Sequence, residues 1–186
     1  MSELIMQLTS ALAAGLLVFA AGLFASAALH KIRTFTEFTG FVAGYRLLPQ
    51  ALVRPASGVI VAAEIAAIAG ALLLIPALAL LPMLLLVLYA GAMVINLLRG
   101  RDDIDCGCGG TPMPISTTAV ARNLLLAAAF GWAASRPIGT FDVLESTPAL
   151  IIPALAFALC LGLFYAVFNQ LEANRAIRRR LWQRSA

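Results

Sequence analysis

Apolar residues occur in long runs that are separated by short polar segments. The runs end at polar or turn positions, such as His30-Lys31, Pro76 and Arg99. Each run approximates the roughly 20 residues that an α-helix needs to cross about 30 Å of hydrocarbon. We therefore predict an all-α integral membrane protein with a single domain, built as a bundle of about five transmembrane helices. The predicted spans are residues 8–29, 56–75, 77–98, 117–134 and 148–168.

The connection at residues 34–50 has a different pattern. Its aromatic residues recur at three- and four-residue spacing: Phe35, Phe38, Phe41 and Tyr45. Polar residues occupy the positions between them, so we predict an amphipathic helix that lies at the membrane interface after the first span. Periodicity alone does not distinguish this helix from a plain connector without function.

Composition agrees with a membrane protein. The 186 residues are 62% hydrophobic and 12% charged, with a mean hydropathy of +0.95. Soluble domains carry about 25% charged residues, so a water-facing surface cannot be built from so little charge. The alternating segments of about ten residues that form a membrane β-barrel are not visible. A net charge of +4 without a basic, aromatic-rich stripe argues against nucleic-acid binding.

The positive charges bear on orientation. With five spans, the 34–50 connection, the polar loop at 99–116 and the basic tail at 169–186 lie on one side of the membrane. All but one of the 13 Lys and Arg residues then share that side, Arg136 being the exception. The positive-inside rule places this side in the cytoplasm, with the tail near anionic lipid. Stable disulfides belong to oxidising compartments, so thiol redox chemistry in the loop favours the opposite orientation.

The loop at 99–116 contains Cys106 and Cys108, separated by one glycine. One interpretation is a redox pair, because a disulfide across so small a ring is strained and strained disulfides are oxidising and labile. A second is metal ligation, which is disfavoured because zinc and Fe–S sites usually need four ligands. The third is a pair of inert thiols. Composition alone does not decide between redox chemistry and inert thiols, and we predict no metal site.

Polar residues around this loop are candidates for supporting roles. Arg99 and Arg101 would lower a thiol pKa, whereas Asp105 would raise it. Asn96 before the loop, and Arg122-Asn123 after it, are placed to hydrogen-bond across its base.

Two further residues lie inside predicted spans. Glu64 is in the middle of the second span, where an ionisable group is costly and by default faces the bundle interior with a partner. The sequence does not distinguish two roles for Glu64: a step in a proton path, or a neutral carboxyl that only holds helices together. Cys160 in the fifth span is most often a small packing residue in such a place, and a resolving thiol is the weaker alternative.

Several of these residues occur together in one known family. The runs Ile95-Asn96-Leu97-Leu98-Arg99-Gly100-Arg101, Asp105-Cys106-Gly107-Cys108-Gly109, Ile115-Ser116 and Arg122-Asn123 resemble the MauE family of methylamine utilisation proteins. The first span, the Phe-rich stretch and Glu64 resemble the wider DoxX-like membrane family. The resemblance covers nearly the whole chain, and the CxC block is its most specific part.

The resemblance implies a role in a bacterial inner membrane, in maturation of the β (small) subunit of periplasmic methylamine dehydrogenase. That subunit carries several disulfides and a tryptophan tryptophylquinone cofactor, and a MauD-like thioredoxin-fold protein acts beside MauE. The CxC loop is then expected on the periplasmic side, with Cys106 and Cys108 as the exchanging thiols. The order of elements also resembles the quinone-linked vitamin K epoxide reductase type. A quinone is therefore a candidate cofactor, although this chain has CxC where that type has CxxC.

Two other functions remain as hypotheses. A non-enzymatic scaffold would hold the immature subunit and its maturation partners, with structural cysteines. A transporter rests only on Glu64 and the helical composition. It would predict an internal repeat or broken helices, and the sequence shows no clear repeat.

Overall fold

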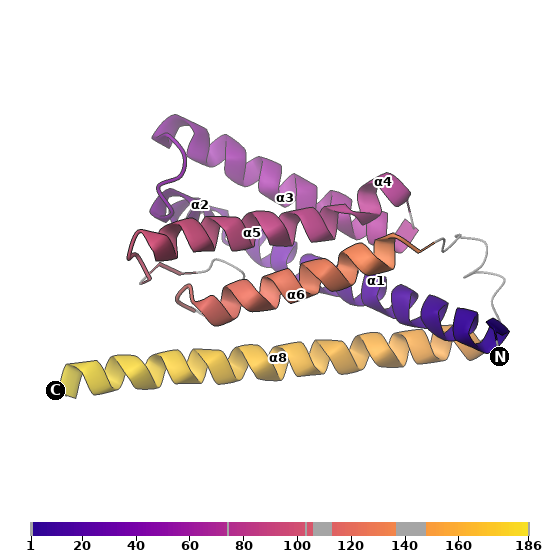
Figure 1. The fold of residues 1–186 in the computed structure, drawn as a ribbon. Helices are drawn as coiled ribbons and strands as arrows, with labels where there is room; N and C mark the ends of the chain where they lie inside the picture. The colour runs from indigo at the N-terminus through magenta and orange to yellow at the C-terminus, as the bar shows by residue number, and fades with distance from the viewer. Residues whose placement is uncertain (1, 74, 103, 106–112, 137–147, 186) are drawn as a thin grey trace.

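The chain folds into a helical bundle. The computed structural model describes residues 2–73, 75–102, 104–105, 113–136 and 148–185, and these residues form helices, one isolated antiparallel bridge and no strand (Figure 1). The all-α prediction is confirmed. The helices are α1 (Ser2–Arg33), α2 (Phe35–Gly44), α3 (Gln50–Leu73), α4 (Pro76–Ala79), α5 (Leu81–Leu98), α6 (Thr117–Ala134) and α8 (Pro148–Ser185).

Four helices within the described residues are long and apolar enough to cross a membrane, which makes this a multi-pass membrane protein. They cover Ile5–Arg33, Gln50–Leu73, Leu81–Leu98 and Ile151–Arg175. The prediction of about five spans differs by one helix, α6. This helix forms at the predicted residues, but Arg122 and Asn123 make it less apolar than the other four. A polar pair of this kind needs partners inside the bundle.

Three boundaries differ from the predicted ones. The predicted span at 77–98 is divided into α4 and α5, with Pro82 in the first turn of α5, where its missing N–H costs no hydrogen bond. The second span begins earlier, at Gln50. The last helix continues to Ser185, so the predicted basic tail is helical. Residues 169–185 contain no Gly or Pro to end the helix.

Helix α1 is the central element of the bundle and packs against α3, α6 and α8. Its aromatic residues Phe19 and Phe24 lie in a core with Leu86 of α5 and Phe130 of α6. The approach of α8 to α1 depends on Gly15, because a Cβ at this position would lie 2.8 Å from the carbonyl oxygen of Ala154. Small residues allow such close contact between membrane helices.

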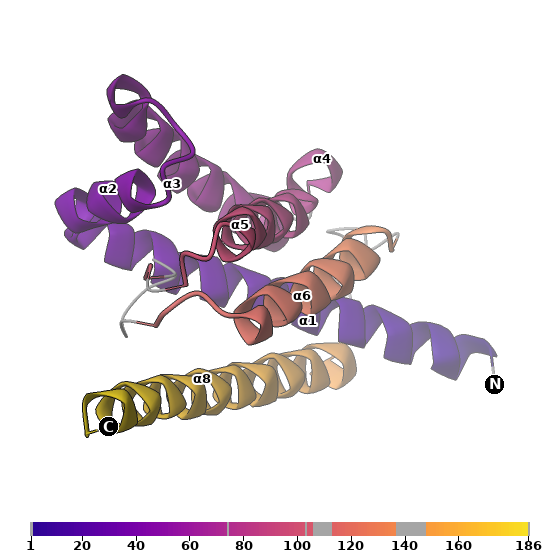
Figure 2. The ribbon, with the colours of Figure 1, turned by 60° about the vertical axis from the view of Figure 1, so that its left-hand side comes forward.

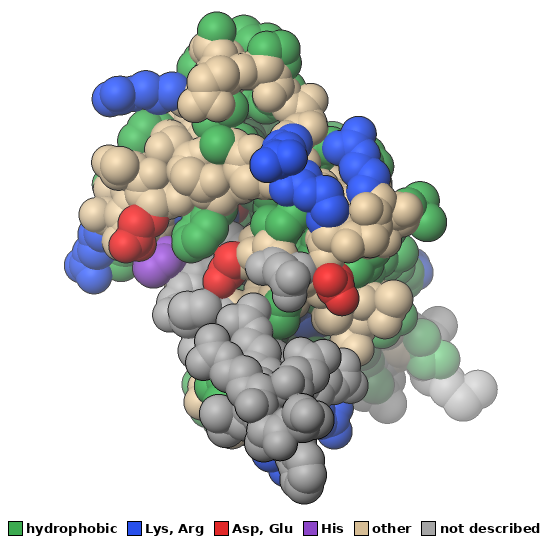
Figure 3. All heavy atoms as spheres, turned by 90° about the vertical axis from the view of Figure 1, so that its left-hand side faces the viewer, with side chains coloured by type: hydrophobic (Ala, Val, Ile, Leu, Met, Phe, Trp, Pro, Cys, Tyr) green, Lys and Arg blue, Asp and Glu red, His purple; other side chains and the backbone are tan. Residues whose placement is uncertain are grey.

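The polar connections gather at one end of the bundle. Helix α2, the segment after α5, the start of α6 and the C-terminal end of α8 all lie there, opposite the N-terminus (Figures 1 and 2). Helix α6 runs from this end to the other, so the path of the chain is that expected for five passes. Lys and Arg side chains gather on this end (Figure 3). Helix α2 covers most of the predicted amphipathic stretch and buries Phe38.

Candidate functional site

The end of α5 is fastened to the end of α2 by Arg101. Its Nη2 donates to the carbonyl oxygen of Gly44 at 2.9 Å, and its Nη1 donates to Asn96 Oδ1 at 3.1 Å. Asn96 is fully buried, and its own amide donates to the carbonyl of Ala92 at 3.1 Å. The turn before Arg101 uses Gly100 at a φ of +67°, a conformation that favours glycine. Arg101 and Asn96 thus form one clamp at the base of the loop.

The loop that carries the cysteines begins and ends at neighbouring positions. Asp105 and Pro114 form the antiparallel bridge, and the Ile115 amide donates to the Ile104 carbonyl at 2.9 Å. Ile115 is buried beside Met93 and Ala119. Helix α6 then starts with Ser116, whose Oγ accepts from the Ala119 amide at 3.1 Å. Cys106 and Cys108 themselves lie outside the described residues.

Tyr45 lies at the same base. Burial raises the pKa of its hydroxyl from 10.0 to about 12, and the negative charge of nearby Asp105 adds to the shift. The phenol is therefore neutral at physiological pH. Arg99 completes this end of the bundle, with its Nη1 donating to the carbonyl of Arg46 at 3.4 Å.

A second polar centre lies between α1, α3 and α5. Glu64 is fully buried, and Lys31, which is only 3% exposed, places its Nζ 2.5 Å from Glu64 Oε1. The Tyr89 hydroxyl donates to the same oxygen at 2.6 Å. The Lys31 ammonium also lies over two aromatic rings, 5.2 Å from the Phe38 centroid and 5.4 Å from the Tyr89 centroid. The predicted inward orientation and partner of Glu64 are thus present.

A third polar group joins α6 to α8. Arg122 donates to Asn169 of α8 and to Asn123 beside it, and its guanidinium lies 5.3 Å from the Tyr165 ring centroid. Arg122 and Asn123 do not join the Asn96–Arg101 clamp in the described contacts. They line a small internal cavity of about 30 Å³ together with Glu64 and Lys31.

Two buried polar atoms at this small cavity make no hydrogen bond to described residues. They are Glu64 Oε2 and Asn123 Nδ2. One is an acceptor and the other a donor, and the cavity is large enough to hold a single water molecule. The small cavity therefore connects the Lys31–Glu64 pair with the Arg122 group.

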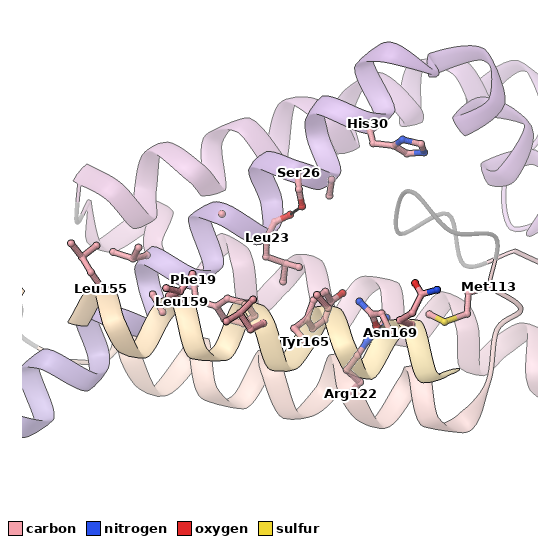
Figure 4. Close-up of a pocket in the computed structure, with 18 residues that line it drawn as sticks. Phe19, Leu23, Ser26, His30, Met113, Arg122, Leu155, Leu159, Tyr165 and Asn169 are labelled. Carbon is pink, nitrogen blue, oxygen red and sulfur yellow. Dashed lines mark hydrogen bonds between the residues drawn. The ribbon is translucent and has the colours of Figure 1, made fainter. Parts of the chain in front are cut away.

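A larger cavity of about 800 Å³ lies between α1 and α8 (Figure 4). Phe19, Leu155 and Leu159 line one part of it, and Tyr165, Arg122, Asn169 and Met113 line another. The two cavities are adjacent, because Leu23, Ala27, Arg122 and Tyr165 line both of them. Met113 is the first described residue after the cysteine segment.

Sequence reasoning missed several of these residues. It placed Lys31 in the first polar connection, as one of the charges that set orientation, whereas Lys31 is buried in α1 as the partner of Glu64. The need of an intramembrane carboxylate for a cation was the available signal. Tyr89, Tyr165 and Asn169 gave no comparable signal. Cys160 is an exposed free thiol on α8. Among the described residues, no three His, Cys, Asp or Glu residues group as metal ligands.

The family model described as methylamine utilisation protein MauE matches residues 8–136. The chain belongs to the MauE family. The MauE protein of Paracoccus versutus is 46% identical over 136 residues, which are 67% of this chain and 72% of that protein. The MauE protein of Methylophilus methylotrophus is 34% identical over 172 residues, 88% of this chain and 87% of that protein. No solved structure matches.

The MauE match contains most of the polar groups described above. The matched region spans Lys31, Glu64, Tyr89, the Asn96–Arg101 clamp and Arg122, whereas α8 with Tyr165 and Asn169 lies beyond it. The MauE protein of Paracoccus denitrificans is 43% identical over 116 residues, and the aligned part spans 62% of that protein. The predicted family is therefore confirmed, and the chain is a methylamine utilisation protein by family.

Proposed function

We propose that this chain is a membrane maturation factor for the β subunit of periplasmic methylamine dehydrogenase, and that it exchanges disulfides through Cys106 and Cys108. The observation that carries the proposal is the closed base of the cysteine loop in a MauE-family protein. The Asp105–Pro114 bridge joins the two ends of the loop, and the Arg101 clamp ties that base to α2. The two residues that flank the CxC segment therefore lie beside each other at the polar end of the bundle.

The exchange step uses the oxidised form of the pair. A thiolate of the substrate subunit attacks one sulfur of the Cys106–Cys108 disulfide, the S–S bond breaks, and the other cysteine leaves as a thiolate. A second substrate thiolate then attacks the mixed disulfide. The substrate gains a disulfide, and the CxC pair gains two electrons as a dithiol. Reoxidation transfers these electrons to a disulfide of a MauD-like thioredoxin-fold partner or to a membrane quinone.

The substrate fixes the side of the membrane in this proposal. Because the dehydrogenase is periplasmic, the CxC loop faces the periplasm of a bacterial inner membrane, in opposition to the count of positive charges. The burial of Lys31 removes one charge from that count. Labelling of Cys106 and Cys108 in intact cells with a membrane-impermeant thiol reagent, after mild reduction, tests the orientation. Labelling only after permeabilisation would contradict it, and a Cys160→Ser background removes the third thiol.

A scaffold without thiol chemistry is the alternative function, and a trapping experiment separates the two. Cys106→Ser and Cys108→Ser are made singly in a Cys160→Ser background and expressed with the β subunit. Exchange predicts that at least one of the two variants accumulates a mixed disulfide with the subunit or the thioredoxin-fold partner. Stable co-purification without any covalent link in both variants would instead favour the scaffold. The double serine variant is the matched control.

A further inference from the structure

The cavity between α1 and α8 has the size and lining of a small-molecule site. Its volume of about 800 Å³ lies within the range of about 300–1,000 Å³ that is usual for ligand pockets, which are mostly apolar with a few placed polar groups. Leu155, Leu159 and Leu163 of α8 line it and are themselves largely exposed, so the cavity is open along a helix that is long and apolar enough to cross a membrane. A ligand can therefore enter it from the bilayer.

The lining changes from apolar to polar along α8. Phe19 and Leu23 of α1 face Leu155 and Leu159 in the apolar part (Figure 4). Towards the C-terminal part of α8, the lining consists of Tyr165, Arg122, Asn169 and Gln170, with His30 across the cavity on α1. Such a gradient matches a molecule with a hydrocarbon tail and a polar head.

Charge indicates the chemistry of the head. Arg122 is 8% exposed, and its hydrogen-bond partners among the described residues are the amides of Asn123 and Asn169. Among the described residues that line the small cavity beside it, the only carboxylate is Glu64, which is already paired with Lys31. The described part of this buried group therefore holds two cations and one carboxylate. A desolvated guanidinium without a carboxylate is costly, and hydrogen-bond-accepting oxygens of a ligand offset that cost.

We propose that this cavity binds a membrane amphiphile. Its head-group oxygens accept hydrogen bonds from Arg122 and Asn169, and its tail lies along Phe19, Leu155 and Leu159. Two classes of membrane molecule have this chemistry: acidic phospholipids, which supply an anionic phosphate, and isoprenoid quinones, which supply carbonyl oxygens. The proposal concerns binding alone and stands independently of thiol exchange at Cys106 and Cys108.

Two glycines allow the cavity to be filled without disturbing the backbone. Gly22 and Gly162 line the cavity, and a Cβ added at either position meets no atom within 4 Å. Gly22→Leu and Gly162→Leu therefore place a side chain in the cavity. Gly91→Leu in α5 is the matched control, because Gly91 is equally open and does not line the cavity.

The test is native mass spectrometry of the full chain in detergent, titrated with phosphatidylglycerol, with phosphatidylcholine of the same acyl chains, or with ubiquinone-2. We expect saturable binding of phosphatidylglycerol or of ubiquinone-2, whichever class is the ligand, with affinity at least tenfold above that for phosphatidylcholine. Gly22→Leu and Gly162→Leu should abolish this binding and Gly91→Leu should preserve it. Arg122→Gln should weaken it by about tenfold or more, as expected for loss of a charged hydrogen bond.

Three results would overturn the proposal. They are binding of neither class, equal binding of phosphatidylglycerol, ubiquinone-2 and phosphatidylcholine, and binding that the cavity-filling variants leave unchanged. If Arg122→Gln does not fold, the comparison of Gly162→Leu with Gly91→Leu still shows whether the ligand binds in this cavity.

Discussion

The buried Lys31–Glu64 pair makes a quantitative prediction about stability. In the variant Glu64→Leu, the partners that the Lys31 ammonium keeps among the described residues are the ring faces of Phe38 and Tyr89. In Lys31→Met, the described partner that the Glu64 carboxylate keeps is the Tyr89 hydroxyl. Removing one partner of a buried ion pair costs about 3–5 kcal/mol, because the remaining charge is desolvated and unpaired. The free energy of unfolding of each single variant should fall by about that amount.

The double variant should be far less damaging than the sum of the singles. Lys31→Met with Glu64→Leu replaces both charges by apolar groups of similar volume, which is often neutral or stabilising. The Tyr89 hydroxyl then loses its acceptor, at a cost of about 1–3 kcal/mol, and Tyr89→Phe in a triple variant should recover most of it.

Thermal unfolding in detergent measures these differences. For a chain of 150–250 residues, 1 kcal/mol moves Tm by about 2–4 °C, so each single variant should lower Tm by about 6–20 °C. Glu172→Gln is the control, because it breaks the more exposed Arg175–Glu172 pair, for which about 0–1 kcal/mol is expected. If the double variant lost as much as the two singles added together, or if the singles behaved like Glu172→Gln, the reasoning would be refuted.

Three further predictions concern the packing and the loop base. Gly70→Ala should destabilise the fold by about 1–3 kcal/mol, because its Cβ would lie 2.4 Å from Leu78 Cβ and 2.6 Å from the Leu78 carbonyl oxygen. The control Gly58→Ala should not lower Tm, because a Cβ there meets no atom within 4 Å. Equal losses of Tm in the two variants would contradict this packing. Arg101→Gln should speed hydrogen exchange of the backbone amides in residues 96–105. Arg101→Lys should not restore protection, because an ammonium cannot bond to both the Asn96 side chain and the Gly44 carbonyl as the guanidinium does. Unchanged exchange in Arg101→Gln would argue against the clamp. The neutral Tyr45 phenol contributes stability below about pH 10, and this contribution is lost as the pH rises through about 12. The difference in absorbance at 295 nm between wild type and Tyr45→Phe should therefore titrate near pH 12. A midpoint near pH 10 would contradict the burial of this side chain.

The sequence was sufficient for the helical class, because long apolar runs have few alternatives in a membrane. Glu64 was found because a carboxylate stands out in an apolar span. Its partner was not, since Lys31 lies 33 residues earlier at the polar end of a run, and only the packing of α1 on α3 brings the two together. The hydrophobic periodicity of the two helices does not determine which residue of α1 lies beside Glu64.

The Arg122 group shows the same limit. The pair Arg122-Asn123 was predicted to hydrogen-bond across the loop base. Its partner Asn169 lies on α8, 47 residues away, so the assignment depends on how α6 and α8 pack. Asn96 does hydrogen-bond at the loop base, but its partner there is Arg101, for which the sequence had suggested only an effect on a thiol pKa.

The most direct test of thiol exchange is maturation of the dehydrogenase in a methylamine-utilising host that lacks its own copy of this protein. Cys106→Ser with Cys108→Ser is compared with Cys160→Ser, and each variant is first shown to be present in the membrane in equal amount. The amount of disulfide-bonded β subunit carrying its tryptophylquinone cofactor is then measured. We predict that the double serine variant yields none and that Cys160→Ser matches wild type. Full maturation with the double serine variant would contradict exchange at this pair.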